Sequence, residues 1–304
     1  MKCKITENFF DRFIVKDLET NEHKIAFLSG NVKKKNSVLT GDIVQVEKKY
    51  DKNIIVNIDK RKNELIRPPV ANIDNLIIVL SLKNPTPDYM LLDKQLVLCY
   101  FKNINPIICV NKLDLLDEDS KKEIEYINKV YKNNGYDVFY TSSKTEENID
   151  LLLKKIEGTT SAFSGNSGVG KSSITNIILK NKSNNNDVQT LKLEIGDIAR
   201  KTKRGKHTTK KVSLFELENN TYILDTPGFS SYELYDIPYK ELKHAYVEFS
   251  KYNCEFSDCA HVIENEDVCF VKRNVKCSNI DKNRYERYVY LYDKLKKIDD
   301  RKYK

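Results

Sequence analysis

The sequence predicts an α/β protein made of three consecutive regions. In residues 1–66, short β-prone runs alternate with turn signals, a pattern typical of a small β domain. Residues 67–234 alternate strand-like and helix-like segments, which favours a mostly parallel sheet covered by helices on both faces. Residues 235–304 are expected to be helical and contain a cluster of cysteines. We therefore expect three domains with these boundaries.

The first region is expected to form a small barrel. Its candidate strands show partial alternation of apolar and polar side chains and cover residues 9–15, 24–28, 43–46 and 54–58. Glycine-containing turn signals lie at residues 29–31 and 41–42. Short strands with a turn about every ten residues favour a barrel, and an ordinary β meander stays open as the alternative.

The second region has a regular succession of elements. An apolar run predicts a buried strand at residues 76–82, and further strands are expected at residues 106–110, 138–140, 160–163 and 222–224. Helical patterns cover residues 88–101, 119–131 and 149–156, and a further helix is expected to begin at Lys171. Residues 181–186 are polar and aperiodic, which predicts a loop, and residues 283–297 predict a charged, tyrosine-rich helix in the last region.

Composition limits the possible classes of protein. Hydrophobic residues make up 40% and charged residues 32% of the chain, which allows both a buried core and a solvated surface. No apolar run approaches the roughly 20 residues of a membrane span, and the first residues lack the apolar core of a signal peptide. We expect a cytoplasmic protein that does not bind a membrane. The net charge of +8 includes eight Lys or Arg in residues 192–211, which favours an acidic partner or only a solvated surface.

The strongest motif lies between a predicted strand and a predicted helix. It fits the phosphate-loop pattern G-x-x-x-x-G-K-[ST] and consists of Gly165, Asn166, Ser167, Gly168, Val169, Gly170, Lys171 and Ser172. Its glycines let backbone N–H groups turn towards phosphates, and the helix N-terminus adds a favourable dipole. We expect Lys171 to reach the β- and γ-phosphates, Ser172 to bind Mg²⁺, and Ser173 to lie beside the nucleotide. A chance match in a structural turn is the alternative, which this context disfavours.

Two further motifs predict a guanine nucleotide. Asn111, Lys112 and Asp114 match the pattern N-K-x-D, in which a carboxylate accepts hydrogen bonds from N1–H and N2–H₂ of guanine. Adenine lacks this donor pair, so Asp114 would discriminate against ATP. A loop that resembles S-A-K, whose backbone would contact guanine O6, is formed by Ser142, Ser143 and Lys144. Each motif is weak alone, and their succession along the chain strengthens both.

Two loops are expected to meet Mg²⁺ and the γ-phosphate. Asp225 and Gly228 fit the pattern D-x-x-G, in which the carboxylate holds Mg²⁺ through water and the glycine N–H contacts the γ-phosphate. Thr208 or Thr209 is expected to complete the Mg²⁺ shell, and the sequence does not decide between them. A plain surface loop is the alternative for residues 204–209.

The motifs occur in a rotated order. In ordinary GTPases the phosphate loop comes first, then D-x-x-G and N-K-x-D, whereas here N-K-x-D and the S-A-K-like loop come first. Because ligand-binding loops of a parallel sheet lie at the carboxyl ends of the strands, joining the old termini and cutting elsewhere preserves the site. The sequence therefore predicts a circularly permuted P-loop GTPase domain, whose C-terminal neighbour follows D-x-x-G directly.

The cysteines favour a metal site over disulfides. The chain has seven, and an odd number in a cytoplasmic protein argues against a disulfide framework. Three thiolates and one imidazole form a candidate tetrahedral zinc site, at Cys254, Cys259, His261 and Cys269. Four protein ligands would close the shell, so such a zinc would be structural. Glu264 and Cys277 are alternative ligands, and unliganded reduced cysteines are the plain alternative.

Taken together, these motifs resemble the RsgA family, the circularly permuted GTPases that depend on the small ribosomal subunit. Residues 41–44, 61–65 and 67–74 are similar to the end of the family's barrel and its interdomain junction. Residues 204–209 and the motif order are similar to its GTPase core, and residues 254–261 to its zinc module. The resemblance covers nearly the whole chain.

The resemblance implies an N-terminal OB-fold barrel, the permuted GTPase domain and a C-terminal helical zinc-binding domain. It implies a GTP hydrolase that acts late in small-subunit maturation, is stimulated by that subunit and contacts its rRNA. One structural Zn²⁺, Mg²⁺ with GTP, and a monomeric state are expected. The family has an apolar residue in place of the water-orienting Gln, as at Phe229, and its precedent points to His207 for catalysis. The stretch from His261 to Cys269 is longer than in the family, so Cys277 stays open as the fourth ligand.

Two other functions stay open at this point. The first is an RNA-binding checkpoint that depends on the nucleotide and whose hydrolysis is incidental. The second is a phosphoryl transferase that uses ATP through the same phosphate loop, against which Asp114 argues.

Overall fold

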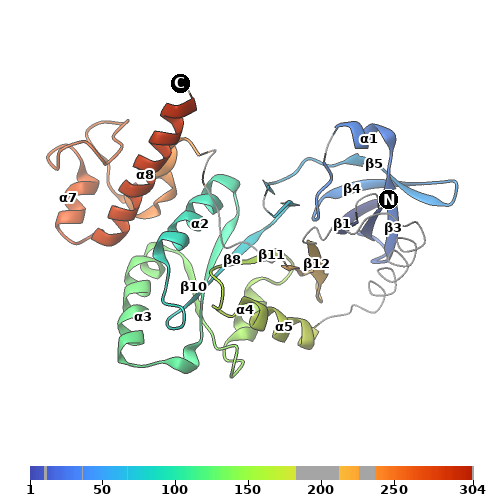
Figure 1. Cartoon of the computed structure of the whole chain (residues 1–304), viewed down its shortest axis with the longest axis horizontal. Coiled ribbons are helices and arrows are strands. Elements are labelled where there is room, and N and C mark those ends of the chain that lie inside the picture. Colours follow the sequence, from blue (N-terminus) through green and yellow to red (C-terminus); the bar gives the residue numbers. More distant parts are fainter. Residues whose placement is uncertain are drawn as a thin grey trace.

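The computed structural model describes residues 1–9, 12–35, 37–66, 68–182, 212–225, 234 and 237–302. The described elements form three groups: a barrel, a central sheet covered by helices, and a helical module on the side away from the barrel (Figure 1). Within the described ranges, no helix combines the length and the apolar character needed to cross a bilayer.

Five strands close into a barrel in the first group. They are β1 (Lys2–Phe9), β2 (Arg12–Asp17), β3 (His23–Leu28), β4 (Ile43–Lys49) and β5 (Lys52–Ile58), with helix α1 (Gly30–Lys35) between β3 and β4. Pairing runs from β1 through β2, β3 and β5 to β4, and β4 pairs back with β1. This closure is the OB-like barrel that was predicted, and it excludes the open meander. The barrel core includes Ile5, Phe13, Val15, Val44 and Ile55.

The strand predicted for residues 9–15 is wrong at its start. β1 ends at Phe9 and β2 begins at Arg12, so the predicted run spans the connection between two strands. The prediction omits β1, although Cys3 and Ile5 alternate with polar residues as in a half-buried strand. The local pattern does not show that Lys4, Thr6 and Glu7 are buried as well. β1 lies against the central sheet, where Lys4 Nζ donates to Thr160 Oγ1 at 2.6 Å. Burial by a distant segment leaves no signal in the local pattern.

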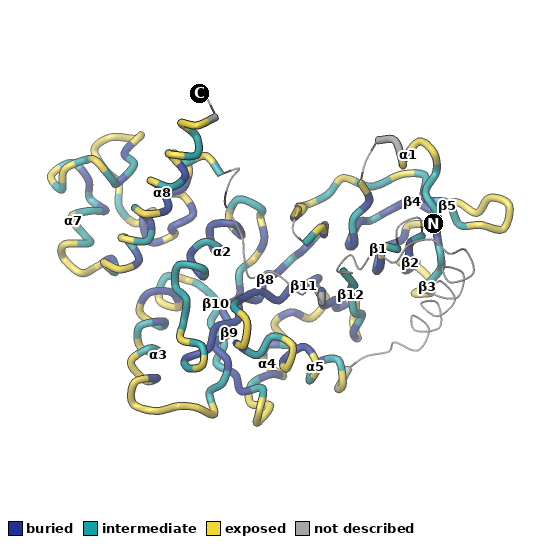
Figure 2. Tube along the Cα trace, viewed as in Figure 1, coloured by how far each residue is buried: buried dark blue, intermediate teal, exposed yellow. Residues whose placement is uncertain are grey.

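The central sheet has the strand order β10-β9-β8-β11-β13-β12. Its strands are β8 (Asn75–Ser81), β9 (Asn105–Asn111), β10 (Asp137–Tyr140), β11 (Thr160–Ser164), β12 (Ser213–Glu216) and β13 (Tyr222–Asp225). All run parallel except β12, which is antiparallel to β13. β8 is buried along its whole length at the centre of the molecule (Figure 2).

Helices cover both faces of this sheet, as the alternating pattern predicts. They are α2 (Tyr89–Lys102), α3 (Glu118–Val130), α4 (Ile149–Lys155) and α5 (Lys171–Lys182), with short 3-10 turns η1 (Leu113–Leu115) and η2 (Lys132–Asn134). The even-numbered apolar residues of β8 share a core with α2 and α3, and the odd-numbered ones share another with α4 and α5. The predicted strands and helices of this region agree with the structure to within about two residues where it is described.

The barrel extends the central sheet. Glu7 of β1 pairs with Ser213 of β12, so strands of the two groups form one continuous sheet. Between the groups lies a small two-stranded sheet made of β6 (Glu64–Leu65) and β7 (Val70–Ala71). The predicted domain boundary after residue 66 falls between β6 and β7, and it stays a prediction.

The last group packs on the side of the sheet that carries α2. It contains the 3-10 turns η3 (Tyr239–Ala245) and η4 (Val247–Lys251) and the helices α7 (Phe270–Lys276) and α8 (Lys282–Lys302). Helix α8 includes the predicted helix 283–297 and is longer at its C-terminal end. The predicted boundary before residue 235 also stays a prediction.

Candidate nucleotide site and metal centre

The predicted nucleotide motifs lie at one edge of the central sheet. Asn111 ends β9, Ser142 lies just after β10, Gly165 follows β11 and Asp225 ends β13. These are the carboxyl ends of parallel strands. β8 and β11 are neighbours, and β9 extends the sheet on one side of this pair while β13 extends it on the other. Ligands of open α/β sheets bind at such a reversal of strand order.

The phosphate loop depends on glycine at two positions. Gly165 has φ 130°, and a Cβ atom there would lie 2.2 Å from the carbonyl oxygen of Val79. Gly170 has φ 99°, and a Cβ atom there would lie 2.1 Å from Nδ2 of Asn111. Any side chain at either position would therefore collide with its neighbour and strain the backbone.

Asn111 connects the phosphate loop to the S-A-K-like loop. Its Nδ2 donates to the carbonyl oxygen of Val169 at 2.9 Å and to Ser143 Oγ at 3.2 Å. Its Oδ1 accepts a hydrogen bond from the backbone N–H of Ser143 at 2.9 Å. Because Asn111 is fully buried, these bonds lie away from water. One side chain thus brings three sequence motifs into one site.

Asp114 lies beside the loop that is expected to contact guanine O6. Its Oδ1 accepts a hydrogen bond from Ser142 Oγ at 2.7 Å. The same hydroxyl oxygen accepts hydrogen bonds from the backbone N–H groups of Lys144 and Thr145, at 3.3 and 3.2 Å. Lys112 Nζ donates to the carbonyl oxygen of Asn84. The base-specificity motifs are therefore held together by their own side chains.

Lys171 lies across the phosphate loop. Its Nζ donates to the carbonyl oxygens of Gly165 and Asn166, at 2.8 and 2.6 Å. Partial burial lowers the pKa of Lys171. Ser172 and Ser173 are exposed in the first turn of α5. The lysine and both serines therefore lie at the loop that the sequence assigns to the phosphates and Mg²⁺.

Four of the predicted site residues lie outside the part of the chain that the structure describes: His207, Thr208, Thr209 and Gly228. The same holds for Phe229 and for the basic segment 192–211. Asp225 is placed as the last residue of β13, but the description does not include its side chain. The roles assigned to these residues stay predictions.

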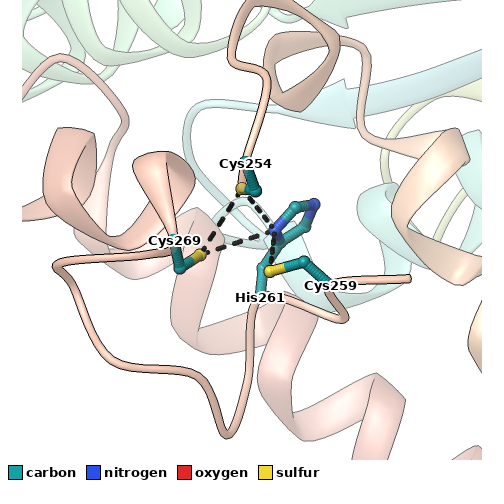
Figure 3. Close-up of side chains that lie close together, drawn as sticks. All are labelled: Cys254, Cys259, His261 and Cys269. Atoms are coloured by element: carbon teal, nitrogen blue, oxygen red, sulfur yellow. Dashed lines mark hydrogen bonds between the residues drawn. The ribbon is translucent and has the colours of Figure 1, made fainter. Parts of the chain in front are cut away.

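A cluster of three cysteines and one histidine lies in the loops between η4 and α8 (Figure 3). The donor atoms of Cys254, Cys259, His261 and Cys269 all lie within 4.8 Å of one another. His261 Nδ1 is 3.3 to 3.5 Å from the three sulfurs, and the sulfurs of Cys254 and Cys269 are 3.9 Å apart. Ideal tetrahedral zinc bond lengths imply about 3.5 Å for sulfur–nitrogen and about 3.8 Å for sulfur–sulfur pairs. The cluster therefore fits a zinc ion in size and donor type.

The surroundings of the cluster favour its role as a metal site. Burial, with a smaller effect of the Lys243 charge, lowers the pKa of His261 to about 4, so the imidazole is neutral as a ligand must be. Tyr285 donates to the carbonyl oxygen of His261 at 2.6 Å. Neither alternative ligand belongs to the cluster: the Glu264 carboxylate accepts the backbone N–H groups of Ala260 and Val262 beside His261, and Cys277 is exposed at the end of α7.

Comparison with known proteins decides the family. The model of the RsgA GTPase family matches residues 58–235, more than half of the 304 residues. The chain belongs to the RsgA GTPase family. The small ribosomal subunit biogenesis GTPase RsgA of Ruminiclostridium cellulolyticum is 42% identical over 277 residues, covering 87% of this chain and 84% of the relative. RsgA of Thermotoga maritima is 36% identical over 283 residues, covering 92% of each.

Solved structures of similar proteins agree with the assignment of this chain to the RsgA family. YjeQ from Thermotoga maritima has a TM-score of 0.82 and 32% identity, over 97% of this chain and 98% of that one. YloQ, described as a circularly permuted GTPase, has a TM-score of 0.77 and 31% identity, over 97% and 95%. The predicted fold class is thus confirmed: an OB-like barrel, a circularly permuted GTPase domain and a Cys₃His module.

Sequence reasoning missed two residues of this RsgA chain that contact the phosphate loop and its strand. Asp88 caps α2 by accepting the backbone N–H of Leu91 at 2.9 Å, and its other oxygen accepts from Asn166 Nδ2 at 3.2 Å. Gln95 Nε2 donates to Ser164 Oγ at 2.5 Å. An Asp before an apolar helical pattern is a visible helix start, but its contact with a loop 78 residues away is not.

Proposed function

We propose that this chain binds the small ribosomal subunit and there hydrolyses GTP to GDP and phosphate, late in the maturation of that subunit. GTP binding is supported mainly by the hydrogen bonds of Asn111, which connect the phosphate loop to the base-specificity loops. Support for the ribosomal part comes from the RsgA relatives, which are named for small-subunit biogenesis.

The proposed nucleotide contacts divide between base and phosphates. Asp114 accepts hydrogen bonds from the guanine edge, and the S-A-K-like loop contacts O6. The backbone of residues 165–172 surrounds the phosphates, and Lys171 moves from its carbonyl partners to the β- and γ-phosphates. Exchanging two neutral carbonyl acceptors for anionic phosphate oxygens strengthens the bonds that Lys171 makes, because donor and acceptor then carry opposite charges.

The proposed catalytic and metal-binding residues surround the γ-phosphate. Ser172 and Asp225 would hold Mg²⁺ together with Thr208 or Thr209, and the ion would neutralise developing phosphate charge. Gly228 would donate its N–H to the γ-phosphate. Phe229 cannot orient a water by hydrogen bonding, so His207 is the proposed residue for that step.

The cluster of Cys254, Cys259, His261 and Cys269 is proposed to hold one structural Zn²⁺. Burial raises the pKa of the Cys259 and Cys269 thiols, so metal binding has to release their protons. The fit of the four donor atoms to tetrahedral geometry supports this assignment.

The proposed partner surface is ribosomal RNA. A net charge of +8 and the basic segment 192–211 suit a phosphate-rich partner. We further propose that the chain acts in the cytoplasm as a monomer, so that one copy binds one subunit.

The test is GTP turnover by the purified protein with small subunits, with large subunits and with neither. We expect slow intrinsic hydrolysis, strong stimulation by small subunits and no stimulation by large ones. Binding to small subunits without any increase in turnover would instead favour a nucleotide-dependent checkpoint. Equal stimulation by both subunits would contradict the proposed partner.

A further inference from the structure

A cavity lies beside the Cys₃His cluster, bordered by the C-terminal part of α2 and the turns η3 and η4. Its volume is about 390 Å³, within the usual size range of sites for small ligands. The donor atoms of the cluster lie within 4.8 Å of one another, which leaves room between them for a single ion. Three of the four cluster residues, Cys254, Cys259 and His261, line the cavity, so an ion held by the cluster would form part of its wall and leave most of the volume open.

Aromatic side chains line this cavity from its interior to its mouth. Tyr246 and Phe249 are almost completely buried, so they lie at its inner end. Tyr100 and Phe256 are 51% and 54% exposed, whereas most large aromatic side chains among the described residues are buried or half-buried. These two residues come from α2 and from the metal-binding loop, and both contribute to the same opening. A planar aromatic ligand could stack on them.

Outside the metal cluster, the polar lining is cationic or neutral. Lys243 Nζ is held in place by the carbonyl oxygens of Ser257 and Cys259, at 3.1 and 3.0 Å. Asn253, with an amide donor and an amide acceptor, also lines the cavity. The lining contains no Asp or Glu in the part of the chain that the structure describes, although Glu241 pairs with the lining residue His244 at 3.5 Å. This combination suits an uncharged ring attached to an anionic backbone.

We propose that this cavity takes an unstacked base of single-stranded RNA. The aromatic side chains would stack on the base, the Asn253 amide would bond its edge, and Lys243 would attract the adjoining phosphate. A base fits this lining better than a protein side chain, because only the nucleotide uses both the rings and the cation. The inference rests on the proposed function, in which ribosomal RNA supplies the base.

The first test measures the affinity of the full-length, GDP-bound protein for a fluorescein-labelled single-stranded oligoribonucleotide of mixed sequence, by fluorescence anisotropy. We expect Tyr100→Ala and Phe256→Ala each to weaken binding about tenfold. The slope of log Kd against log salt concentration should not change, because no phosphate contact is removed. Phe256→Tyr should retain affinity. The matched control is Tyr290→Ala, which removes a 56% exposed tyrosine of α8 outside the cavity and should bind like the parent.

Metal content is measured for every variant, because Phe256 lies between two of the cluster cysteines. Tyr100 lies on α2, outside the metal-binding loop. If Phe256→Ala loses metal, the RNA affinity of Tyr100→Ala therefore decides whether the cavity binds a base. Unchanged affinity in Tyr100→Ala would overturn the proposal.

The second test uses the absence of tryptophan from the sequence. Phe256→Trp introduces a single tryptophan at the mouth of the cavity, and a stacked base should quench its fluorescence when the oligoribonucleotide is added. Tyr290→Trp is the control and should not be quenched. Equal quenching of both would overturn the proposal.

Stimulation of GTP hydrolysis by small subunits is measured in parallel, so that the two proposals can fail separately. Normal stimulation with unchanged RNA affinity in Tyr100→Ala overturns only the base-binding cavity. Weakened RNA affinity in the variants, with no stimulation of the parent protein by small subunits, overturns only the proposed function. If the cavity variants bound small subunits more weakly but kept their affinity for the oligoribonucleotide, the cavity would bind a side chain of a ribosomal protein. That result would overturn the proposal that it binds an RNA base.

Discussion

At the scale of single residues, the N-K-x-D motif has two separate tasks. Asp114 is proposed to select the base, whereas Asn111 is buried and holds the loops around it. The contact of Asn111 with the phosphate loop also explains Gly170, since any Cβ atom there would collide with its amide nitrogen. A motif known for specificity is therefore also part of the architecture of the site.

Asp114→Asn is expected to change base specificity. The amide keeps the shape of the side chain but replaces one acceptor with a donor, so it no longer matches the two donors of guanine. Affinity for GTP and GDP should fall by about a hundredfold or more, as for a buried charged hydrogen bond, while xanthine nucleotides gain affinity. Equilibrium binding of fluorescent guanine and xanthine nucleotides measures both effects. Unchanged affinity for GTP would show that Asp114 does not contact the base.

His207→Ala is expected to separate binding from stimulation. If His207 orients the attacking water, the variant should keep its GTP affinity and its binding to small subunits but lose about a hundredfold of the stimulated rate. Single-turnover hydrolysis with saturating small subunits measures this. Thr209→Ala and Thr208→Ala, tested alongside, would show which threonine the Mg²⁺ dependence requires. Full stimulation of His207→Ala would leave the loop only a positioning role.

At the scale of elements, α2 connects the phosphate loop to the helical module. Its capping residue Asp88 bonds Asn166, and one turn further along Asp93 is fully buried between α2 and α8. Arg284 and Arg287 of α8 both donate to the Asp93 carboxylate. The module is thus joined to the GTPase domain by buried ionic contacts as well as by the chain that follows β13.

Arg284→Met should destabilise the protein strongly. The guanidinium is fully buried, pairs with Asp93 and Glu248, and lies 4.7 Å from the ring centre of Tyr131. Removing it takes the guanidinium away from the buried Glu248 carboxylate and leaves Asp93 with Arg287 alone, which costs about 3–5 kcal/mol. Urea unfolding measures the change, and Arg301→Met, at an exposed position near the end of α8, is the control. A loss no larger than that of the control would contradict this account of the interface.

The four cluster residues should bind about one zinc per chain. Protein purified without chelators should contain it, and removing it should loosen the module because metal binding contributes directly to folding. Cys269→Ser should lose the metal, since its sulfur belongs to the cluster. Cys277→Ser is the matched control and should retain it, because Cys277 is exposed. The reverse result would reassign the fourth ligand, and parent protein without zinc would count against the site.

At the scale of the whole molecule, a polar interface joins the barrel to the sheet. Lys4 of β1 donates to Thr160 of β11 and lies 3.9 Å from the ring centre of Tyr222 on β13. Burial is the main cause that lowers the pKa of Lys4 from 10.5 to about 8. Beside it, Lys16 of β2 pairs with Glu216 of β12. The barrel therefore buries charged groups against strands that flank the expected nucleotide-sensing loops.

Lys4→Met should make the protein more stable at pH 7. Below pH 8 both folded and unfolded chains carry this proton, and the folded chain bears the full cost of a buried charge. Between about pH 8 and 10.5 the unfolded chain binds the proton that the folded one has lost, so this residue's contribution to the free energy of unfolding rises with pH. The variant should gain about 1–3 kcal/mol at pH 7, and its advantage should shrink towards pH 10.5.

Urea unfolding of Lys4→Met at pH 7 and pH 10 tests this, with Lys2→Met at an exposed position of the same strand as the control. If the Met variant were less stable at pH 7, the hydrogen bond to Thr160 and the ring of Tyr222 would outweigh the cost of burial.

Much of the fold could be predicted because the central domain encodes its elements locally. β8 and β9 contain continuous apolar runs, and α2 and α3 begin at visible caps, Asp88 and Asp117, so the positions of these elements follow from neighbouring residues. The motif order predicts the permutation in the same way, since each loop follows its own strand. Spacing and donor type favoured the four cluster residues and left Cys277 and Glu264 open as alternative ligands.

What only the tertiary structure decided depends on contacts between distant segments. Polar residues of β1 are buried against a sheet more than 150 residues away, and the local pattern of the strand does not show this burial. The choice of Cys269 over Cys277 depends on how the loop before α7 folds back to His261, and spacing cannot encode that path. The buried contacts of Asp93 with α8 likewise require two helices to meet, because a single charged residue in a helical pattern looks the same whether it faces water or a partner.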